Sequence, residues 1–236
     1  MKKKILIISL LLVLIFGTII GYKTINTKEK VIHPTNQMDK VKITDEVNYE
    51  EIITKLKNKY NNQDVIALLE IPNVLEEPIV QTTNNDYYLH YDINKHENII
   101  GATFLDYRNK IDESKKLLIY SHSDPEGTLP FVKLTNYNKE EFYKEHKYIY
   151  LTDSTGKRKY EVFSSYIETN DFDYVNLENF NGLTYKEHLY KLKNKSLVKT
   201  DIELDDNSKV LVLQTCSFKE EINSKTKYQL VIAKEV

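Results

Sequence analysis

The sequence contains one cysteine, Cys216, and two arginines, Arg108 and Arg158, among its 236 residues. With a single cysteine no internal disulfide can form, so the fold must be held by its apolar core. Lysine and arginine together number 33, and aspartate and glutamate 35, which leaves a formal net charge of −2. Without a strongly basic field, no nucleic-acid partner is expected.

Repeats and metal-ligand motifs are also missing. No heptad run, glycine repeat or solenoid period is visible, which argues against fibrous and repeat architectures. No group of cysteine and histidine residues has the spacing of zinc ligands, so neither a metal nor another cofactor is predicted. Hydrophobic residues make up 41% of the chain and charged residues 29%, which excludes disorder and suits one good-sized domain with an appendage.

The longest apolar run lies at the N-terminus. Lysines at positions 2–4 precede it, and it extends over residues 5–22 with few interruptions. About 18 apolar residues can just cross a bilayer, and the lysines favour a cytoplasmic N-terminus. A cleaved signal peptide is the alternative, although no small-x-small cleavage site follows Gly21. The sequence therefore predicts a single-pass membrane anchor at residues 1–22.

The remaining chain would then lie outside the cytoplasm. Residues 23–47 are polar and lack periodicity, as in a tether, and residues 48–236 carry the patterns of a folded domain. Outside the cell an exposed, unpaired thiol is open to oxidation. A lone exported cysteine is therefore more often kept for its chemistry than a lone cytosolic one, which favours a functional role for Cys216.

Short strands separated by turn residues dominate the domain. A helix is expected over residues 48–60, with Asn48 as its N-cap. Strands are expected at residues 65–71, 78–81, 101–105, 117–120, 148–152, 159–168, 210–215 and 228–233, and helical inserts at 138–146 and 184–195. This order indicates a closed β-barrel or a sandwich, and we predict the barrel: a mostly-β fold of about eight strands with an N-terminal helix and helical inserts.

Cys216 follows a continuous apolar run. The run begins at Val210 and is rich in leucine and β-branched residues, which is typical of a strand buried on both faces, and the polar Ser217 marks its end. A side chain at the end of such a strand is held rigidly yet opens towards a loop, which suits a nucleophile. The alternative is that Cys216 is a small buried hydrophobe.

His122 stands in the same kind of position, just after the apolar strand that ends at Tyr120. A cysteine and a histidine within hydrogen-bond reach form a minimal thiol nucleophile pair, because imidazole can both take and return a proton. The two residues are 94 positions apart, so only the fold can bring them together. The other histidines lie in the tether, in a polar turn region or within helix patterns, and fit this role less well.

These residues resemble the sortase family. Thr215-Cys216 at the end of an apolar strand is similar to the catalytic end of sortases, and Tyr120-Ser121-His122-Ser123 resembles their histidine loop. The blocks at residues 85–90 and 101–109 are similar to the class B branch. The resemblance covers roughly residues 49–236.

The resemblance implies a cysteine transpeptidase on the outer face of a Gram-positive-type membrane. Cys216 would be the nucleophile that holds the threonyl carbonyl of a sorting signal as a thioester, and His122 the general acid/base. The expected partners are a sorting-signal peptide of the Asn-Pro-x-Thr type and a peptidoglycan or lipid-linked amine as acceptor. Thr215, Ser121 and Ser123 are the candidate substrate-binding residues.

The sequence departs from the sortase pattern at the residue that stabilises the oxyanion, the negatively charged carbonyl oxygen formed during the reaction. Sortases carry an arginine on the final strand, five residues before the alanine that matches Ala233, and Tyr228 occupies that position here. The nearest cation is Lys227. Lysine supplies one charged donor without the fork of arginine, and the tyrosine hydroxyl supplies one neutral donor. Lys227 and Tyr228 are therefore both candidates for this role.

Two other classes of protein compete with this interpretation. L,D-transpeptidases have a His-Gly and a Gly-Cys block, and neither occurs here, while papain-like enzymes place the cysteine before the histidine, at a helix start. The non-enzymatic alternative is a decayed, extracytoplasmic β-domain that binds wall or protein ligands, and the missing arginine is its best support. Thiol reactivity distinguishes them, because a catalytic thiol reacts in the folded state and a packed one does not.

Overall fold

The computed structural model describes residues 47–124, 126–169, 171–216 and 227–236. These residues belong to one unit that spans residues 46–236. The predicted anchor at residues 1–22 and nearly all of the predicted tether lie outside the described residues. Among the described helices, none is long and apolar enough to cross a membrane.

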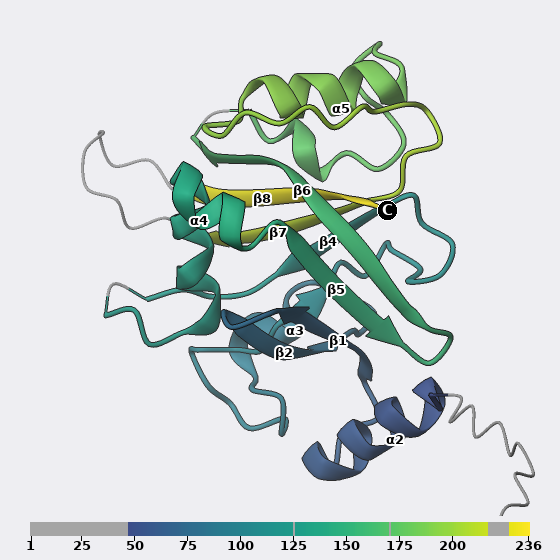
Figure 1. Ribbon diagram of the computed structural model, residues 1–236. Helices are drawn as coiled ribbons and strands as arrows, with labels where there is room; N and C mark the ends of the chain where they lie inside the picture. The colour runs from purple at the N-terminus through teal and green to yellow at the C-terminus, as the bar shows by residue number, and fades with distance from the viewer. Residues whose placement is uncertain (1–46, 125, 170, 217–226) are drawn as a thin grey trace, which may run out of the picture. The chain divides into compact units, whose positions relative to one another are not determined.

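Eight strands close into a barrel in the order β1-β2-β3-β4-β7-β8-β6-β5, with β5 pairing back onto β1 (Figure 1). This confirms the predicted mostly-β closed barrel of about eight strands. The strands are β1 Val65–Ile71, β2 Leu75–Val80, β3 Phe104–Leu105, β4 Lys116–Tyr120, β5 Tyr148–Asp153, β6 Lys157–Glu168, β7 Val210–Cys216 and β8 Tyr228–Glu235.

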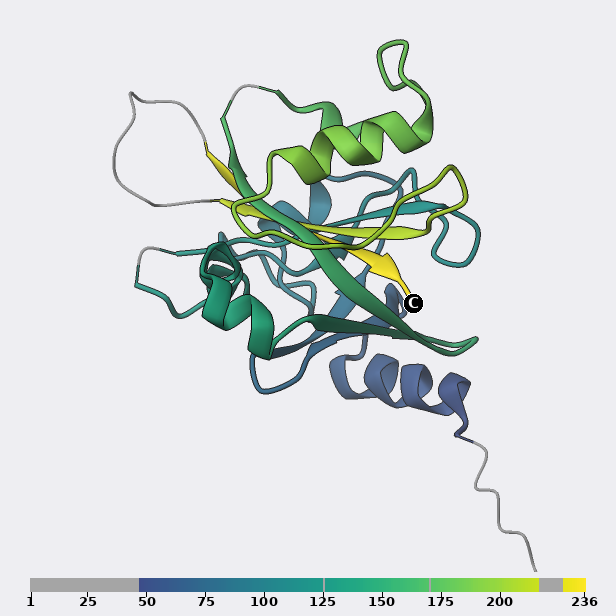
Figure 2. The same cartoon turned by 45° about the horizontal axis from the view of Figure 1, so that its top comes forward.

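Strand β7 is buried on both faces, as its continuous apolar run predicts. Leu211 and Leu213 belong to the core cluster inside the barrel. Val210 and Val212, on the other face, belong to a second cluster that includes Leu189 of helix α5 (Tyr185–Asn194). Figure 2 shows α5 lying across this outer side of the sheet. Because neighbouring side chains point to opposite faces of a strand, only a strand covered on both sides can be apolar throughout.

The helices begin where capping residues stand. Asn48 accepts a hydrogen bond from Glu51 N (3.1 Å) at the start of α2 (Tyr49–Tyr60). Thr184 and Glu187 form a reciprocal capping box at the start of α5. The predicted insert at 138–146 contains α4 (Glu140–Glu145). A 3₁₀ segment, Pro130–Asn138, lies directly before α4 and was not predicted from the sequence. Helix α3 (Tyr87–His90), with four residues, is too short for periodicity to reveal.

The expected strand at 101–105 is reduced to Phe104–Leu105. Gly101 has a φ of +64°, outside the strand region, and Ala102 N donates to Tyr88 O (2.9 Å) in place of a strand partner. The loop conformation at Gly101 therefore shortens this strand.

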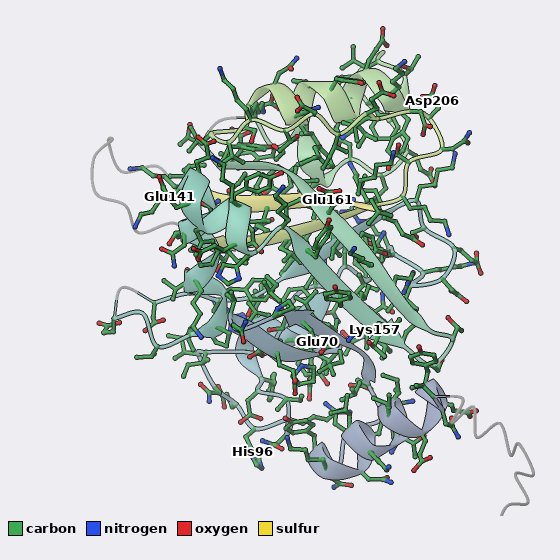
Figure 3. The ribbon with its side chains drawn as sticks, viewed as in Figure 1. Glu70, His96, Glu141, Lys157, Glu161 and Asp206 are labelled. Carbon is green, nitrogen blue, oxygen red and sulfur yellow. The ribbon has the colours of Figure 1, made fainter. Side chains whose placement is uncertain are left out.

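The turn between β5 and β6 follows its sequence signature. Asp153 accepts hydrogen bonds from Thr155 N (2.7 Å) and Gly156 N (3.2 Å), as a turn-forming aspartate does. Just beyond it Lys157 reaches across β5 to Glu70 of β1, at 2.6 Å (Figure 3). This pair is partly exposed and contributes little to stability.

Candidate active site

The parallel pairing of β4 with β7 brings Cys216 and His122 to one edge of the barrel. Partners in this pair are 94 residues apart, as in Tyr120 with Gln214, and the separation of His122 and Cys216 is the same. Ser121 N continues the pairing by donating to Gln214 O (3.1 Å). Both reactive residues therefore lie two positions beyond the last strand pair, where two parallel strands end side by side.

Cys216 and His122 line the same cavity, which has a volume of about 360 Å³ and is here called the thiol cavity. Its other lining residues are Asn85, Leu89, Phe104, Tyr120, Ser121, Gln214, Thr215 and Tyr228. Five of the seven candidate residues from the sequence thus line one cavity: Cys216, His122, Thr215, Ser121 and Tyr228. Sequence reasoning did not single out Asn85 and Tyr120 as site residues, although both stand in or beside the blocks that resemble sortases.

Hydrogen bonds hold the two strand ends together. Ser123 Oγ donates to the backbone oxygen of Cys216 (2.6 Å), and its side chain is buried. Ser123 is not among the described residues that line the thiol cavity, and its contact is with the backbone of Cys216. Ser121 Oγ shares a hydrogen bond with Thr103 Oγ1 (2.9 Å). The Thr215 side chain is 1% exposed, and its hydroxyl has no hydrogen-bond partner among the described residues.

The imidazole of His122 is supported from the α3 side. Its Nε2 lies 3.2 Å from Leu89 O, so an Nε2–H tautomer donates to that carbonyl and leaves Nδ1 as the acceptor. A Cβ at Gly101 would lie only 3.1 Å from His122 Cδ2 and 2.3 Å from Tyr88 O. Gly101 therefore provides the space that the histidine ring occupies.

We expect Gly101→Ala to lower kcat/KM for the transpeptidase reaction that the resemblance implies by about 100-fold. The added methyl displaces His122, and a misplacement of about 1 Å can cost that much. The positive φ of Gly101 adds a strain of about 1–2 kcal/mol. Steady-state kinetics and thermal unfolding separate the two effects. Gly182→Ala is the matched control, since Gly182 has a φ of +84° and nothing within 4 Å of an added Cβ. Equal activity losses in the two variants would contradict the role assigned to Gly101.

The surroundings of Cys216 favour the protonated thiol. Burial raises the pKa of Cys216 above the ordinary thiol value. A base within reach is therefore needed to generate the nucleophile at neutral pH, and His122 lines the same cavity.

The two oxyanion candidates lie differently. Tyr228 is the direct antiparallel partner of Cys216 in the β7–β8 ladder and lines the thiol cavity. Burial and the neighbouring Cys216 raise the pKa of its hydroxyl, which keeps it protonated as a donor. Lys227 directly precedes β8, and neither it nor the arginines Arg108 and Arg158 are among the described residues that line the cavity.

The family model of the sortase domain matches residues 69–236. The chain belongs to the sortase family. It is 27% identical over 243 residues to sortase B of Staphylococcus aureus (strain NCTC 8325 / PS 47), covering 100% of this chain and 98% of that protein. This confirms the family that the Thr-Cys and histidine blocks resemble.

Solved class B sortases share the fold. A crystal structure of sortase B complexed with triglycine has 27% identity and a TM-score of 0.71, covering 81% of this chain and 88% of that one. A Staphylococcus aureus sortase B–substrate complex has 25% identity and a TM-score of 0.67, with 79% and 92% coverage. The chain is thus a cysteine transpeptidase of the class B sortase type, and the L,D-transpeptidase and papain-like alternatives are set aside.

Proposed function

We propose that this sortase cleaves a C-terminal sorting signal after a threonine, holds the acyl group as a thioester on Cys216 and transfers it to a cell-wall peptidoglycan amine. The observation that carries the proposal is that Cys216 and His122, at the ends of two parallel strands, line one cavity. The Staphylococcus aureus relative solved as a substrate complex supports a peptide substrate. An Asn-Pro-x-Thr-type signal is the one expected of class B.

Each half of the reaction uses the same two side chains. As Cys216 Sγ bonds to the threonyl carbonyl carbon, His122 takes the thiol proton and delivers it to the leaving amine when the peptide bond breaks. An acceptor amine then attacks the thioester carbon, His122 takes its proton, and the C–S bond breaks to regenerate the thiol. Because the pKa of Cys216 is raised, the first proton transfer is essential at neutral pH.

The negative charge on the carbonyl oxygen needs a donor. Tyr228 is the better placed candidate, because it pairs with Cys216 and lines the thiol cavity. Its hydroxyl provides one neutral hydrogen bond where the family uses an arginine fork, so a slower chemical step is expected. Lys227 remains the alternative donor.

The acceptor amine has an approach of its own. A second cavity of about 290 Å³ also contains Ser121 and His122 in its walls, together with the carboxylates Glu76, Glu77 and Asp92. Burial raises the pKa of Glu77 to about 6, so it is ionised at neutral pH. Two cavities that meet at one general base suit a two-substrate transferase, and carboxylates suit a cationic amine. The sortase B complexed with triglycine supports an amine acceptor.

The N-terminal sequence supports a location at the cell membrane. The apolar run over residues 5–22, preceded by lysines, would anchor the chain in the cell membrane with its N-terminus in the cytoplasm. The tether over residues 23–47 would then hold the catalytic domain on the outer face, where both the sorting signal and the cell-wall amine are found.

The test uses the full-length chain in mild detergent with a panel of candidate sorting-signal peptides and triglycine as acceptor. We expect mass spectrometry to show a product cut after threonine, an acyl adduct on Cys216 and a triglycine conjugate, all absent from Cys216→Ala. Tyr228→Phe and Lys227→Met in the same assay decide which residue serves the oxyanion. No cleavage together with an unreactive thiol would instead support the decayed, ligand-binding alternative.

A further inference from the structure

Asp106 is a fully buried carboxylate immediately after β3, with a side-chain exposure of 0%. A buried charge is costly unless its hydrogen bonds are satisfied. Its Oδ1 accepts from Arg108 N (2.9 Å) and Arg108 Nε (2.9 Å). Its Oδ2 accepts from Arg108 Nη2 (2.7 Å), Asn85 Nδ2 (3.0 Å) and Tyr120 OH (2.9 Å). The carboxylate is thus a junction for side chains that are distant in sequence.

Two of these donors are walls of the thiol cavity. Asn85 and Tyr120 both line it, beside Cys216 and His122. Asn85 Oδ1 also accepts from Tyr107 N (2.9 Å), so both ends of its amide are fixed in direction. Tyr120 is the last residue of β4, two positions before His122. Asp106 therefore orients the surface against which a bound peptide would lie.

Arg108 extends this network to a third wall. Its Nη2 also donates to Val175 O (3.2 Å), in the short 3₁₀ turn Asp173–Val175. From the same turn Tyr174 OH donates to Gln214 Oε1 (2.8 Å), and Gln214 lines the cavity. Burial opposes ionisation of Asp106, but the hydrogen bonds from Arg108, Tyr120 and Asn85 outweigh it and hold its pKa below the ordinary value.

We propose that Asp106, held by Arg108, is a positioning residue for the sorting-signal peptide, because it fixes Asn85 and Tyr120 in the cavity wall before the peptide binds. This inference rests on the proposed sortase reaction. Preorganised walls reduce the ordering cost of binding. Loss of the carboxylate should therefore weaken peptide capture more than it slows the chemical step, and it should leave the thiol itself unchanged.

Asp106→Asn tests this, because an amide offers a single acceptor oxygen to donors that occupy both carboxylate oxygens. We expect kcat/KM for the cleaved peptide to fall about 10- to 100-fold, mainly through KM. The rate of Cys216 alkylation by iodoacetamide should stay within about twofold of wild type, as expected for an unchanged thiol. Arg108→Lys, which removes the fork at a partly exposed side chain, should show the same pattern to a smaller degree.

The second buried aspartate–arginine pair provides the control. Asp153 is almost as buried and pairs with Arg158, and neither is among the described residues that line the thiol cavity. Asp153→Asn should lower the melting temperature without raising KM. A KM that is unchanged in both Asp106→Asn and Arg108→Lys would overturn the inference. The inference would also be overturned if the variants lost activity and Cys216 alkylation only in proportion to their loss of thermal stability.

The remaining outcomes are also decisive. If Asp106→Asn does not fold, Arg108→Lys and Tyr120→Phe supply the comparison of KM with kcat. A wild-type chain that cleaves no peptide would overturn the proposed function, and this inference with it. A cleaving wild type whose variants keep its KM would overturn the positioning role alone.

Discussion

His122→Ala should reduce kcat/KM for sorting-signal cleavage by about 10³-fold, within the range attributed to general acid–base catalysis. Burial raises the pKa of Cys216, so without His122 the thiolate must form by simple ionisation. The residual activity of the variant should therefore rise about tenfold per pH unit from pH 6 to 8, as the thiolate fraction does. The wild-type profile should be flatter over this interval. Peptide-cleavage kinetics across this range provide the measurement.

His96→Ala is the control for this experiment. His96 is exposed at the surface (Figure 3). His122 lines two of the described cavities, and His96 lines neither of them. Its replacement should leave cleavage unchanged. An activity for His122→Ala within tenfold of wild type would contradict the assignment of His122 as the general acid/base.

Lys116→Met should stabilise the protein at pH 7, because Lys116 is a buried cation with no acidic partner in contact among the described residues. Lys116 begins β4 and is 2% exposed, and its Nζ lies 2.9 Å from His188 Nε2. Burial and the charge of Arg108 lower the pKa of Lys116 to about 7. Burial and the charge of Lys116 lower the pKa of His188 to about 3, so the histidine is neutral. The Phe180 ring stacks on the imidazole, which keeps the site apolar.

The sign of the pH dependence follows from proton binding. An unfolded lysine has a pKa of about 10.4, whereas the folded one is near 7. Between these values the unfolded chain binds more protons, so the free energy of unfolding should rise with pH. Below the folded pKa the lysine is protonated in both the folded and the unfolded chain, so the full cost of burying its charge lowers the free energy of unfolding. We expect Lys116→Met to remove this rise and to add on the order of a few kcal/mol at pH 7.

Urea unfolding from pH 6 to about 9.5 measures this effect, with the upper limit set below the ordinary tyrosine pKa of about 10. Lys115→Met is the matched control, because the neighbouring Lys115 donates to Asp206 O at the surface. Lys115→Met should show the same change of unfolding free energy with pH as the wild type. A wild-type free energy of unfolding that does not change with pH, together with destabilisation by Lys116→Met, would show that burial does not lower the pKa of Lys116.

Local patterns determined much of this fold. The apolar run from Val210 predicted a strand buried on both faces, because only such a strand has no polar side. Asn48 and the Thr184–Glu187 pair marked helix starts, because capping hydrogen bonds join residues only three apart. Cys216 and His122 were candidates because each follows an apolar strand and carries chemistry that few other side chains offer.

The tertiary structure alone decided how these pieces meet. The register that aligns His122 with Cys216 comes from pairing β4 with β7, which are separated by β5, β6 and α5 in the chain. No local pattern encodes such a register, since the partner strand supplies half of its hydrogen bonds.

The same limit applies to the supporting residues. Asp106 lies within the block at residues 101–109 and Lys116 directly precedes the expected strand at 117–120, but no local pattern gives either residue a role. Their burial, and the partners Tyr120 and His188, arise from contacts between segments far apart in the chain. The sequence by itself therefore determined which residues are candidates for the chemistry, because reactivity belongs to the side chain. The fold decided what orients and charges them, because orientation and pKa depend on neighbours that only tertiary packing supplies.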